Sequence, residues 1–209
     1  MCRRYVSPDE ASIEREFALE KTGFALAINF NAAPLQILPV IRWIEGRPAP
    51  ASLRWGLGYH SRFNARMETL ASNASYRDAW KAGQRCLVPA LGFYEWQIKA
   101  DGTKQPLYIQ VEDQDIFGFA GLWNGDSFTI VTLPANTLIA EIHDAKRRMP
   151  AILTRDARDV WLAGGSPDEA AVLRAYPSDR LVAYAVSTRV NFAGNNDETL
   201  IEPLETNVD

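Results

Sequence analysis

Residues 85–98 have the sequence RCLVPALGFYEWQI, two short apolar runs separated by Leu91 and Gly92. Short runs that are rich in β-branched and aromatic residues and bounded by glycine are typical of β-strands. Because so short a connection cannot contain a crossover helix, the two strands are expected to pair antiparallel. This stretch therefore predicts an antiparallel sheet.

Runs of the same character recur along the chain, at residues 24–28, 37–43, 107–111, 116–122, 128–133 and 181–187. Helices are predicted between them. The first has Ser7 as its N-cap and Pro8 at its first helical position, and the others cover residues 68–82, 136–143, 155–162 and 167–176. The pattern predicts an α+β fold, in which helices flank a mainly antiparallel, curved or barrel-like sheet. One compact domain is expected over residues 2–209, with Met1 removed.

The composition favours a folded protein with one substantial core, because 47% of its 209 residues are hydrophobic. The net charge of −4 is not typical of non-specific nucleic-acid binding. Residues 54–85, however, contain six basic and two acidic side chains, which makes that stretch +4 and leaves −8 on the rest. A binding patch and a solvated helix face both fit such a stretch.

The chain shows no targeting or membrane signal. Pro8, Asp9 and Glu10 stand where a signal peptide would be apolar, and no long apolar run follows. A soluble, monomeric protein of the cytoplasm is expected, at the nucleoid if the source is a bacterium. The two Cys and two His residues are not spaced as metal ligands, so neither a metal nor a cofactor is predicted. Cys86 lies in a strand and is expected to be a free, buried thiol.

Cys2 follows the initiator methionine. Removal of Met1 would leave an α-amine and a thiol on adjacent carbons. Such an aminothiol can form an imine with an aldehyde and then close to a stable five-membered thiazolidine. The alternative is a cysteine of no function at a frayed terminus.

The segment Asn64 to Thr69 combines an amide, a guanidinium and a carboxylate. Arg66 could bind a phosphate with two hydrogen bonds, Asn64 could hold an amine or a sugar hydroxyl, and Glu68 could orient Arg66. Residues of the same types also cap helices, so a structural role is equally compatible.

Two further residues are candidates for proton transfer. Strand alternation places Glu95 on the same face as Phe93, and Tyr94 on the other. A carboxyl on a buried face has a raised pKa that suits a general acid or base, although an ion pair with a core arginine fits as well. His143 is the type of residue that carries protons near neutral pH, but a histidine at a helix C-terminus also interacts favourably with the helix dipole.

In combination, these motifs resemble the SRAP (SOS response-associated peptidase) domain family over nearly the whole chain. The resemblance rests on Met1-Cys2-Arg3-Arg4-Tyr5, Asn31-Ala32-Ala33-Pro34, Trp55-Gly56-Leu57, Asn64-Ala65-Arg66-Met67-Glu68-Thr69, Arg85-Cys86-Leu87-Val88-Pro89-Ala90, Gly92-Phe93-Tyr94-Glu95-Trp96, Ala120-Gly121-Leu122-Trp123, Phe128-Thr129-Ile130-Val131-Thr132, and His143 to Met149-Pro150.

The resemblance implies a protein that shields abasic sites in single-stranded DNA by a thiazolidine cross-link. Cys2 would be the nucleophile once Met1 has been removed, by the protein itself or by an aminopeptidase. Asn64 would support its amine or the opened sugar, and Glu95 and His143 would transfer protons. Lyase and self-peptidase activities are further expectations. The residues expected to line the DNA path are Arg3, Arg4, Asn31, Pro34, Trp55, Arg66, Glu68 and Thr69.

The chain departs from the family pattern at three places. Arg3 stands where a glycine is usual, the loop after Leu57 is shorter and lacks its usual Pro-x-Trp, and the segment from His143 to Pro150 is two residues longer. Arg3 is expected to attract phosphate or to crowd the nucleophile, and Tyr59 or His60 to replace the missing stacking aromatic.

Two other functions remain compatible with the sequence. A Cys–His hydrolase would use Cys2 as a thiolate and His143 as its base. Such an enzyme does not need a terminal nucleophile, whereas a thiazolidine requires one. Whether a residue added before Cys2 destroys activity therefore distinguishes the two functions. A non-covalent binder of single-stranded DNA would use the basic stretch with Trp55 and Tyr59. Only a covalent adduct survives denaturing electrophoresis, which separates this binder from the first hypothesis.

Overall fold

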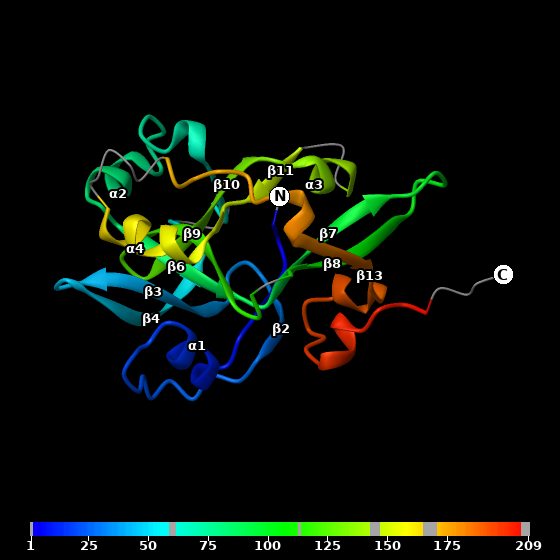
Figure 1. The fold of residues 1–209 in the computed structure, drawn as a ribbon, viewed down its shortest axis with the longest axis horizontal. Helices are drawn as coiled ribbons and strands as arrows, with labels where there is room; N and C mark the ends of the chain where they lie inside the picture. The colour runs from blue at the N-terminus through cyan, green and yellow to red at the C-terminus, as the bar shows by residue number, and fades with distance from the viewer. Residues whose placement is uncertain (1, 59–61, 113, 143–146, 165–170, 206–209) are drawn as a thin grey trace.

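The computed structural model describes residues 2–58, 62–112, 114–142, 147–164 and 171–205 (Figure 1). The strands in this part of the chain are β1 (Tyr5–Ser7), β2 (Asn29–Ala32), β3 (Ile37–Ile44), β4 (Arg47–Trp55), β5 (Asn64–Arg66), β6 (Arg85–Ala90), β7 (Gly92–Ile98), β8 (Lys104–Val111), β9 (Phe117–Asn124), β10 (Ser127–Pro134), β11 (Arg148–Pro150), β12 (Ile152–Leu153) and β13 (Leu181–Ala185). The helices are α1 (Glu10–Glu16), α2 (Arg77–Lys81), α3 (Thr137–Ile142) and α4 (Arg155–Ala163), with short 3-10 turns η1 (Met67–Thr69), η2 (Ser178–Arg180), η3 (Thr188–Asn191) and η4 (Glu198–Ile201).

The strands form two sheets. The first has five strands in the order β13-β8-β7-β1-β2. The second has eight, and within it β10-β4-β3-β6-β9 closes into a ring, because β9 also pairs with β10. Most pairs are antiparallel, whereas β10 runs parallel to β4 and β5. The predicted α+β fold with a barrel-like sheet is thus confirmed. The β3–β4 and β7–β8 hairpins extend toward opposite ends of the molecule (Figure 1).

Seven of the predicted strands are present as β3, β6, β7, β8, β9, β10 and β13. The strand predicted at residues 24–28 is wrong. The carboxylate of Glu10 accepts hydrogen bonds from the backbone N–H groups of Phe24 and Ala25. Ala25 has a φ of 52°, in the left-handed region, which interrupts an extended chain. The apolar residues here therefore form a loop that leads into β2.

Strand β4 was not predicted, and it contains Pro48 and Pro50, although proline is rare within strands. In the structure these prolines pair with Trp43 and Ile41 of β3. Within the described residues, β4 meets β10 only at Arg54 and Trp55, so the half that contains the prolines has no strand on its other side. Proline is tolerated there because its missing N–H would have faced away from the sheet.

Helix α1 begins later than predicted, because Tyr5–Ser7 are used as β1. Its N-cap is Asp9, whose Oδ1 accepts a 2.9 Å hydrogen bond from the N–H of Ser12. Ser7 is a strand residue instead of a cap. The sheet pairing of β1 thus decides the start of the helix.

The predicted helix at 68–82 is broken into η1 and α2. Between them the side chain of Asn73 accepts a hydrogen bond from the N–H of Ser75, an Asx turn that competes with helix. Of the helix predicted at 167–176, residues 167–170 lie outside the described part of the chain, and residues 171–176 are not helical. Helix α3 agrees with the helix predicted at 136–143, although His143 lies outside the described residues. Helix α4 agrees with the helix predicted at 155–162.

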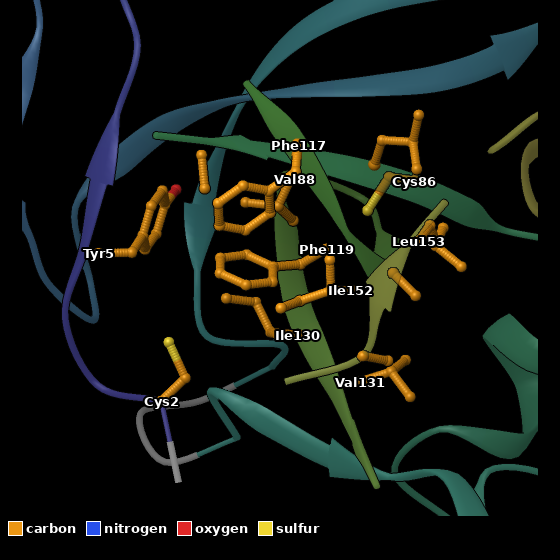
Figure 2. Close-up of a cluster of buried hydrophobic side chains, with 14 of the residues drawn as sticks. Cys2, Tyr5, Cys86, Val88, Phe117, Phe119, Ile130, Val131, Ile152 and Leu153 are labelled. Carbon is orange, nitrogen blue, oxygen red and sulfur yellow. The ribbon is translucent and has the colours of Figure 1, made fainter. Parts of the chain in front are cut away.

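The core joins both sheets, and Figure 2 shows its central part. Side chains of β6, β9, β10 and β12 meet there around Phe119. Phe93 belongs to this core, whereas Tyr94 belongs to a second buried cluster on the other face of β7, as the alternation predicts. Cys2 and Tyr5 extend the core toward the N-terminus. The first residues of the described chain are therefore fixed by packing.

Candidate functional site

Cys2 is completely buried, at one end of the core cluster, with its sulfur pointing into it (Figure 2). Strand β1 holds it there. Tyr5 pairs with Phe93 of β7, and the N–H of Tyr94 donates a 3.0 Å hydrogen bond to the carbonyl of Arg4. The thiol is within 3.7 Å of the same carbonyl, to which it donates. The alternative of a frayed terminus is thus wrong for Cys2.

The surroundings of Cys2 keep its thiol protonated. Burial and, second, the negative charge of Glu95 raise the pKa of the Cys2 thiol well above its ordinary range. The thiol is therefore neutral near pH 7, and a neutral thiol is a poor nucleophile. An adjacent base or positive charge is needed before its sulfur can react.

Asn64, the first residue of β5, contacts Cys2 directly. Its Nδ2 donates a 2.9 Å hydrogen bond to the carbonyl oxygen of Cys2. Its Oδ1 is buried and accepts no hydrogen bond from the residues that the structure describes. Since a buried amide oxygen without a partner is unfavourable, this atom is an acceptor available for a donor beside Cys2.

The backbone of Asn64 is fixed by a residue that the sequence analysis did not single out. Tyr76, which is buried ahead of α2, donates its hydroxyl to the carbonyl oxygen of Asn64 at 3.2 Å. Burial raises the pKa of the Tyr76 phenol, so the hydroxyl remains a donor over the physiological range. Tyr76, Asn64 and Cys2 thus form a continuous hydrogen-bonded series.

Glu95 is buried, with 1% of its surface exposed, on the face of β7 that also carries Phe93. The sequence predicted this placement, and the effect of Glu95 on the Cys2 thiol shows that the two groups interact electrostatically. His143 lies outside the described residues, so its predicted role stays a prediction.

The sequence suggested that Glu68 orients Arg66. In the structure Glu68 binds Arg148 instead. Both oxygens of Glu68 accept 2.9 Å hydrogen bonds from Arg148, which also donates to the hydroxyl and the carbonyl of Thr132. Arg148 lowers the pKa of the Glu68 carboxyl. Arg148 therefore joins η1 to β10 and β11. Its place before Met149-Pro150 was visible in the sequence, but its partner, 80 residues away, was not.

Two residues predicted to line the DNA path are buried instead. Trp55 is 0% exposed, packs edge-on against Tyr5 at a ring distance of 5.3 Å, and donates its Nε1 to the carbonyl of Phe63. Alternation along β4 turns Trp55 inward and Arg54 outward. Asn31 is also 0% exposed, and its Nδ2 donates to the carbonyls of Val190, Phe192 and Asn195. Both side chains stabilise the fold beneath the site.

The other predicted DNA contacts lie at or near the surface. Arg3 and Arg66 are exposed, and Arg4 and Pro34 are half-buried. The Oγ1 of half-buried Thr69 donates to the carbonyl of Arg66, which closes the η1 turn. Tyr59 and His60 lie outside the described residues. Arginine is thus the main polar group that the N-terminus and β5 present to solvent near Cys2.

Three further observations concern the described residues. They contain no group of three or more His, Cys, Asp or Glu side chains that could hold a metal ion. Cys2 and Cys86 are both free thiols, and Cys86 is buried, as predicted. None of the described helices is long and apolar enough to cross a membrane.

Comparison with known proteins gives concordant results. The family described as SOS response associated peptidase (SRAP) matches residues 1–193. The abasic site processing protein YoqW of Bacillus subtilis (strain 168) is 36% identical over 196 residues, which cover 83% of this chain and 85% of that protein. The abasic site processing protein YedK of Escherichia coli (strain K12) is 31% identical, over 68% of this chain and 67% of that protein.

Solved structures share the fold. A protein from Bacteroides thetaiotaomicron superposes with a TM-score of 0.83 at 23% identity, covering 98% of this chain and 100% of that chain. A protein from Bordetella bronchiseptica gives a TM-score of 0.77 at 29% identity, over 89% of this chain and all of that one (100%).

Proposed function

This chain belongs to the SOS response associated peptidase family, and from that premise we propose that it processes abasic sites in DNA by forming a covalent bond through Cys2. Relatives that are 31–36% identical carry the name abasic site processing protein. We propose single-stranded DNA as the substrate and a thiazolidine as the product. No cofactor takes part in this scheme.

One observation carries the proposal more than any other. The amide of Asn64 donates to the carbonyl of Cys2 at 2.9 Å, while its own oxygen is buried and free to accept. The α-nitrogen of Cys2 is two bonds from the carbon of this carbonyl, and we propose that, once Met1 has been removed, the free amine donates to Asn64 Oδ1. Asn64 would then hold the amine beside the incoming aldehyde.

The raised pKa of the Cys2 thiol determines the order of steps. The neutral α-amine attacks the aldehyde carbon of the opened sugar first, and the resulting carbinolamine takes up a proton and loses water to become an iminium. The positive iminium then makes ionisation of the thiol easier. As the sulfur bonds to the former aldehyde carbon, its proton passes to a base. One water leaves in total, and the carbonyl double bond is replaced by a C–N and a C–S bond.

Glu95 is the base that fits this last step. Its charge already acts on the Cys2 thiol, and transfer of the thiol proton to Glu95 removes the repulsion between thiolate and carboxylate. The same carboxyl, once protonated, can return a proton when the ring opens. His143 is proposed as a second proton carrier.

The exposed arginines would place the strand. Arg3 and Arg66 are proposed to bind phosphates on either side of the abasic sugar. Half-buried Arg4 and Pro34 would line the same path. The buried position of Cys2 requires the sugar to leave the line of the backbone. A flexible single strand allows this bend, whereas a paired duplex resists it.

A Cys–His hydrolase receives no support from the described residues. Such an enzyme needs a thiolate, which a positive neighbour stabilises, whereas burial and Glu95 favour the neutral thiol.

Denaturing electrophoresis tests the proposal. Single-stranded and fully paired oligonucleotides with one abasic site are incubated with the native chain, with Cys2→Ala, with Cys2→Ser and with a chain that carries an extra residue before Cys2. A heat-stable adduct is expected only for the native chain and only on the single strand. A heat-stable adduct with the extended chain, or equal yields on duplex and single strand, would contradict the mechanism.

A further inference from the structure

Strand β5, which carries Asn64, has only three residues and one open edge. In the described part of the chain it pairs with β10 alone. The N–H of Ile130 in β10 donates to the carbonyl of Phe63 at 2.9 Å, and successive carbonyls of a strand point to opposite edges. The carbonyl of Asn64 therefore points away from β10, toward the open edge.

The hydroxyl of Tyr76 binds this open edge. It donates to the carbonyl of Asn64 at 3.2 Å and so takes the place of a strand neighbour. The side chain of Asn64 in turn binds Cys2, because its Nδ2 donates to the Cys2 carbonyl at 2.9 Å. Asn64 is thus held by β10 on one side and by Tyr76 on the other, while its amide reaches the nucleophile of the proposed reaction.

Tyr76 is itself fixed in place. It is the N-cap residue of α2, where its carbonyl accepts a 2.8 Å hydrogen bond from the N–H of Trp80. Its own N–H donates to the carbonyl of Asn73 at 3.0 Å, and its ring is buried. Helix α2 is anchored by Arg85, whose Nη1 donates to the carbonyl of Trp80 at 3.0 Å. The hydroxyl is therefore a fixed point against which β5 is placed.

A tyrosine at this position supplies one bond that a phenylalanine would not. The apolar packing of the two rings is the same, so the difference between them is the hydrogen bond to Asn64. That bond keeps Asn64 where its Nδ2 reaches the Cys2 carbonyl. Accurate placement matters in catalysis, because a displacement of about 1 Å can lower a rate by about 10²-fold.

We propose that Tyr76 is a positioning residue for the reaction of Cys2 and that it acts through its hydroxyl. By fixing Asn64, it determines where the α-amine of Cys2 lies when the aldehyde arrives. The inference rests on the proposed function, since it takes this amine to be the attacking group. The effect passes through Asn64, because among the described residues the carbonyl of Asn64 is the acceptor of the Tyr76 hydroxyl.

Tyr76→Phe is the test variant, because it removes the hydroxyl and keeps the ring. Tyr184→Phe is its control, since Tyr184 in β13 also donates its hydroxyl to a backbone carbonyl, that of Ile201 at 3.0 Å. Single-turnover adduct formation on a single strand with one abasic site should be about tenfold slower in Tyr76→Phe. Tyr184→Phe should react at the native rate. Both variants should keep the native affinity for a strand with a tetrahydrofuran analogue of the abasic site, which has no aldehyde.

A double-mutant cycle with Asn64→Ala separates positioning from a general loss of stability. If Tyr76 acts through the side chain of Asn64, Tyr76→Phe causes no further slowing once that side chain has been removed. A merely structural role predicts the same slowing in both backgrounds. Equal slowing in both backgrounds, or a native rate of adduct formation in Tyr76→Phe, would overturn the proposal.

Proton exchange of the Asn64 side chain gives a second readout, which needs no DNA. NMR measures how fast the Nδ2 protons of Asn64, which bind the Cys2 carbonyl, exchange with water. Tyr76→Phe should speed this exchange about two- to tenfold, the range for the loss of one hydrogen bond. Tyr184→Phe should leave it unchanged.

The two proposals fail separately. If the native chain forms no adduct but exchange is faster in Tyr76→Phe, the support of Asn64 by Tyr76 stands and the covalent mechanism falls. If the native chain forms the adduct and Tyr76→Phe matches it in rate and in exchange, the positioning role falls and the covalent mechanism stands.

Discussion

Replacing Glu68 by glutamine should destabilise the fold by removing the charge that faces Arg148. The side chain of Arg148 is 10% exposed and that of Glu68 is 44% exposed, so the pair is partly screened by solvent. Glutamine can keep one of the two hydrogen bonds, and Thr132 keeps two more. We expect a loss of about 1–2 kcal/mol in the free energy of unfolding. For a chain of this size, that lowers Tm by about 2–8 °C.

The loss should depend on pH. Arg148 lowers the pKa of Glu68 in the folded state below its unfolded value. The carboxylate therefore stabilises the fold above the unfolded pKa, and this contribution disappears as the pH falls through the folded pKa. Urea denaturation of the native chain and Glu68→Gln should give a clear difference at pH 7, and this difference should shrink steadily as the pH falls below the unfolded pKa of glutamate. A difference that does not change over this range of pH, or that is absent at pH 7, would refute the ion-pair assignment.

Three further predictions concern the proposed site. Asn64→Ala should slow adduct formation up to about 10²-fold, because the Cys2 amine loses its positioning group, while affinity is retained for a single strand that carries a tetrahydrofuran analogue of the abasic site, which has no aldehyde. Rapid-quench time courses measure the rate, and an unchanged rate would remove Asn64 from the mechanism. Glu95→Gln should slow ring closure about 10²–10⁴-fold, since glutamine fills the same space but carries no proton. The imine should then accumulate, so that borohydride traps it; if closure is slow but no imine can be trapped, Glu95 is not the base. Arg66→Ala should weaken binding to single strands of every sequence alike, and should reduce the steepness with which the logarithm of the binding constant falls with the logarithm of salt concentration by about one. A loss of affinity confined to particular sequences would show that Arg66 contacts bases instead of phosphate.

Local patterns were sufficient to predict the buried position of Glu95 on the same face as Phe93, because that position follows from alternation within β7. The aminothiol proposed at Cys2 depends only on the place of this residue after Met1. The same reasoning predicted the strands from β6 to β10, each of which is a short apolar run between turn residues. Where one strand decides the orientation of a side chain, the sequence is informative.

Side chains whose surroundings depend on distant segments could not be predicted. Trp55 is buried because β4 forms despite its prolines, and Asn31 is buried because its amide binds carbonyls about 160 residues away. Glu68 is a partner of Arg148 through the pairing of β10 with β11 and β5. In each case a pattern typical of DNA contact belongs to residues that hold the site in shape.

The central claim is that the α-amine and the thiol of Cys2 both bond to the same carbon of the abasic sugar. Mass spectrometry of the purified adduct, intact and after digestion, tests this most directly. The account predicts that the protein part lacks Met1, that the adduct is lighter than its two components by one water, and that the sugar remnant is on the peptide that begins with Cys2. An adduct that retains Met1, or one attached through another residue, would contradict it.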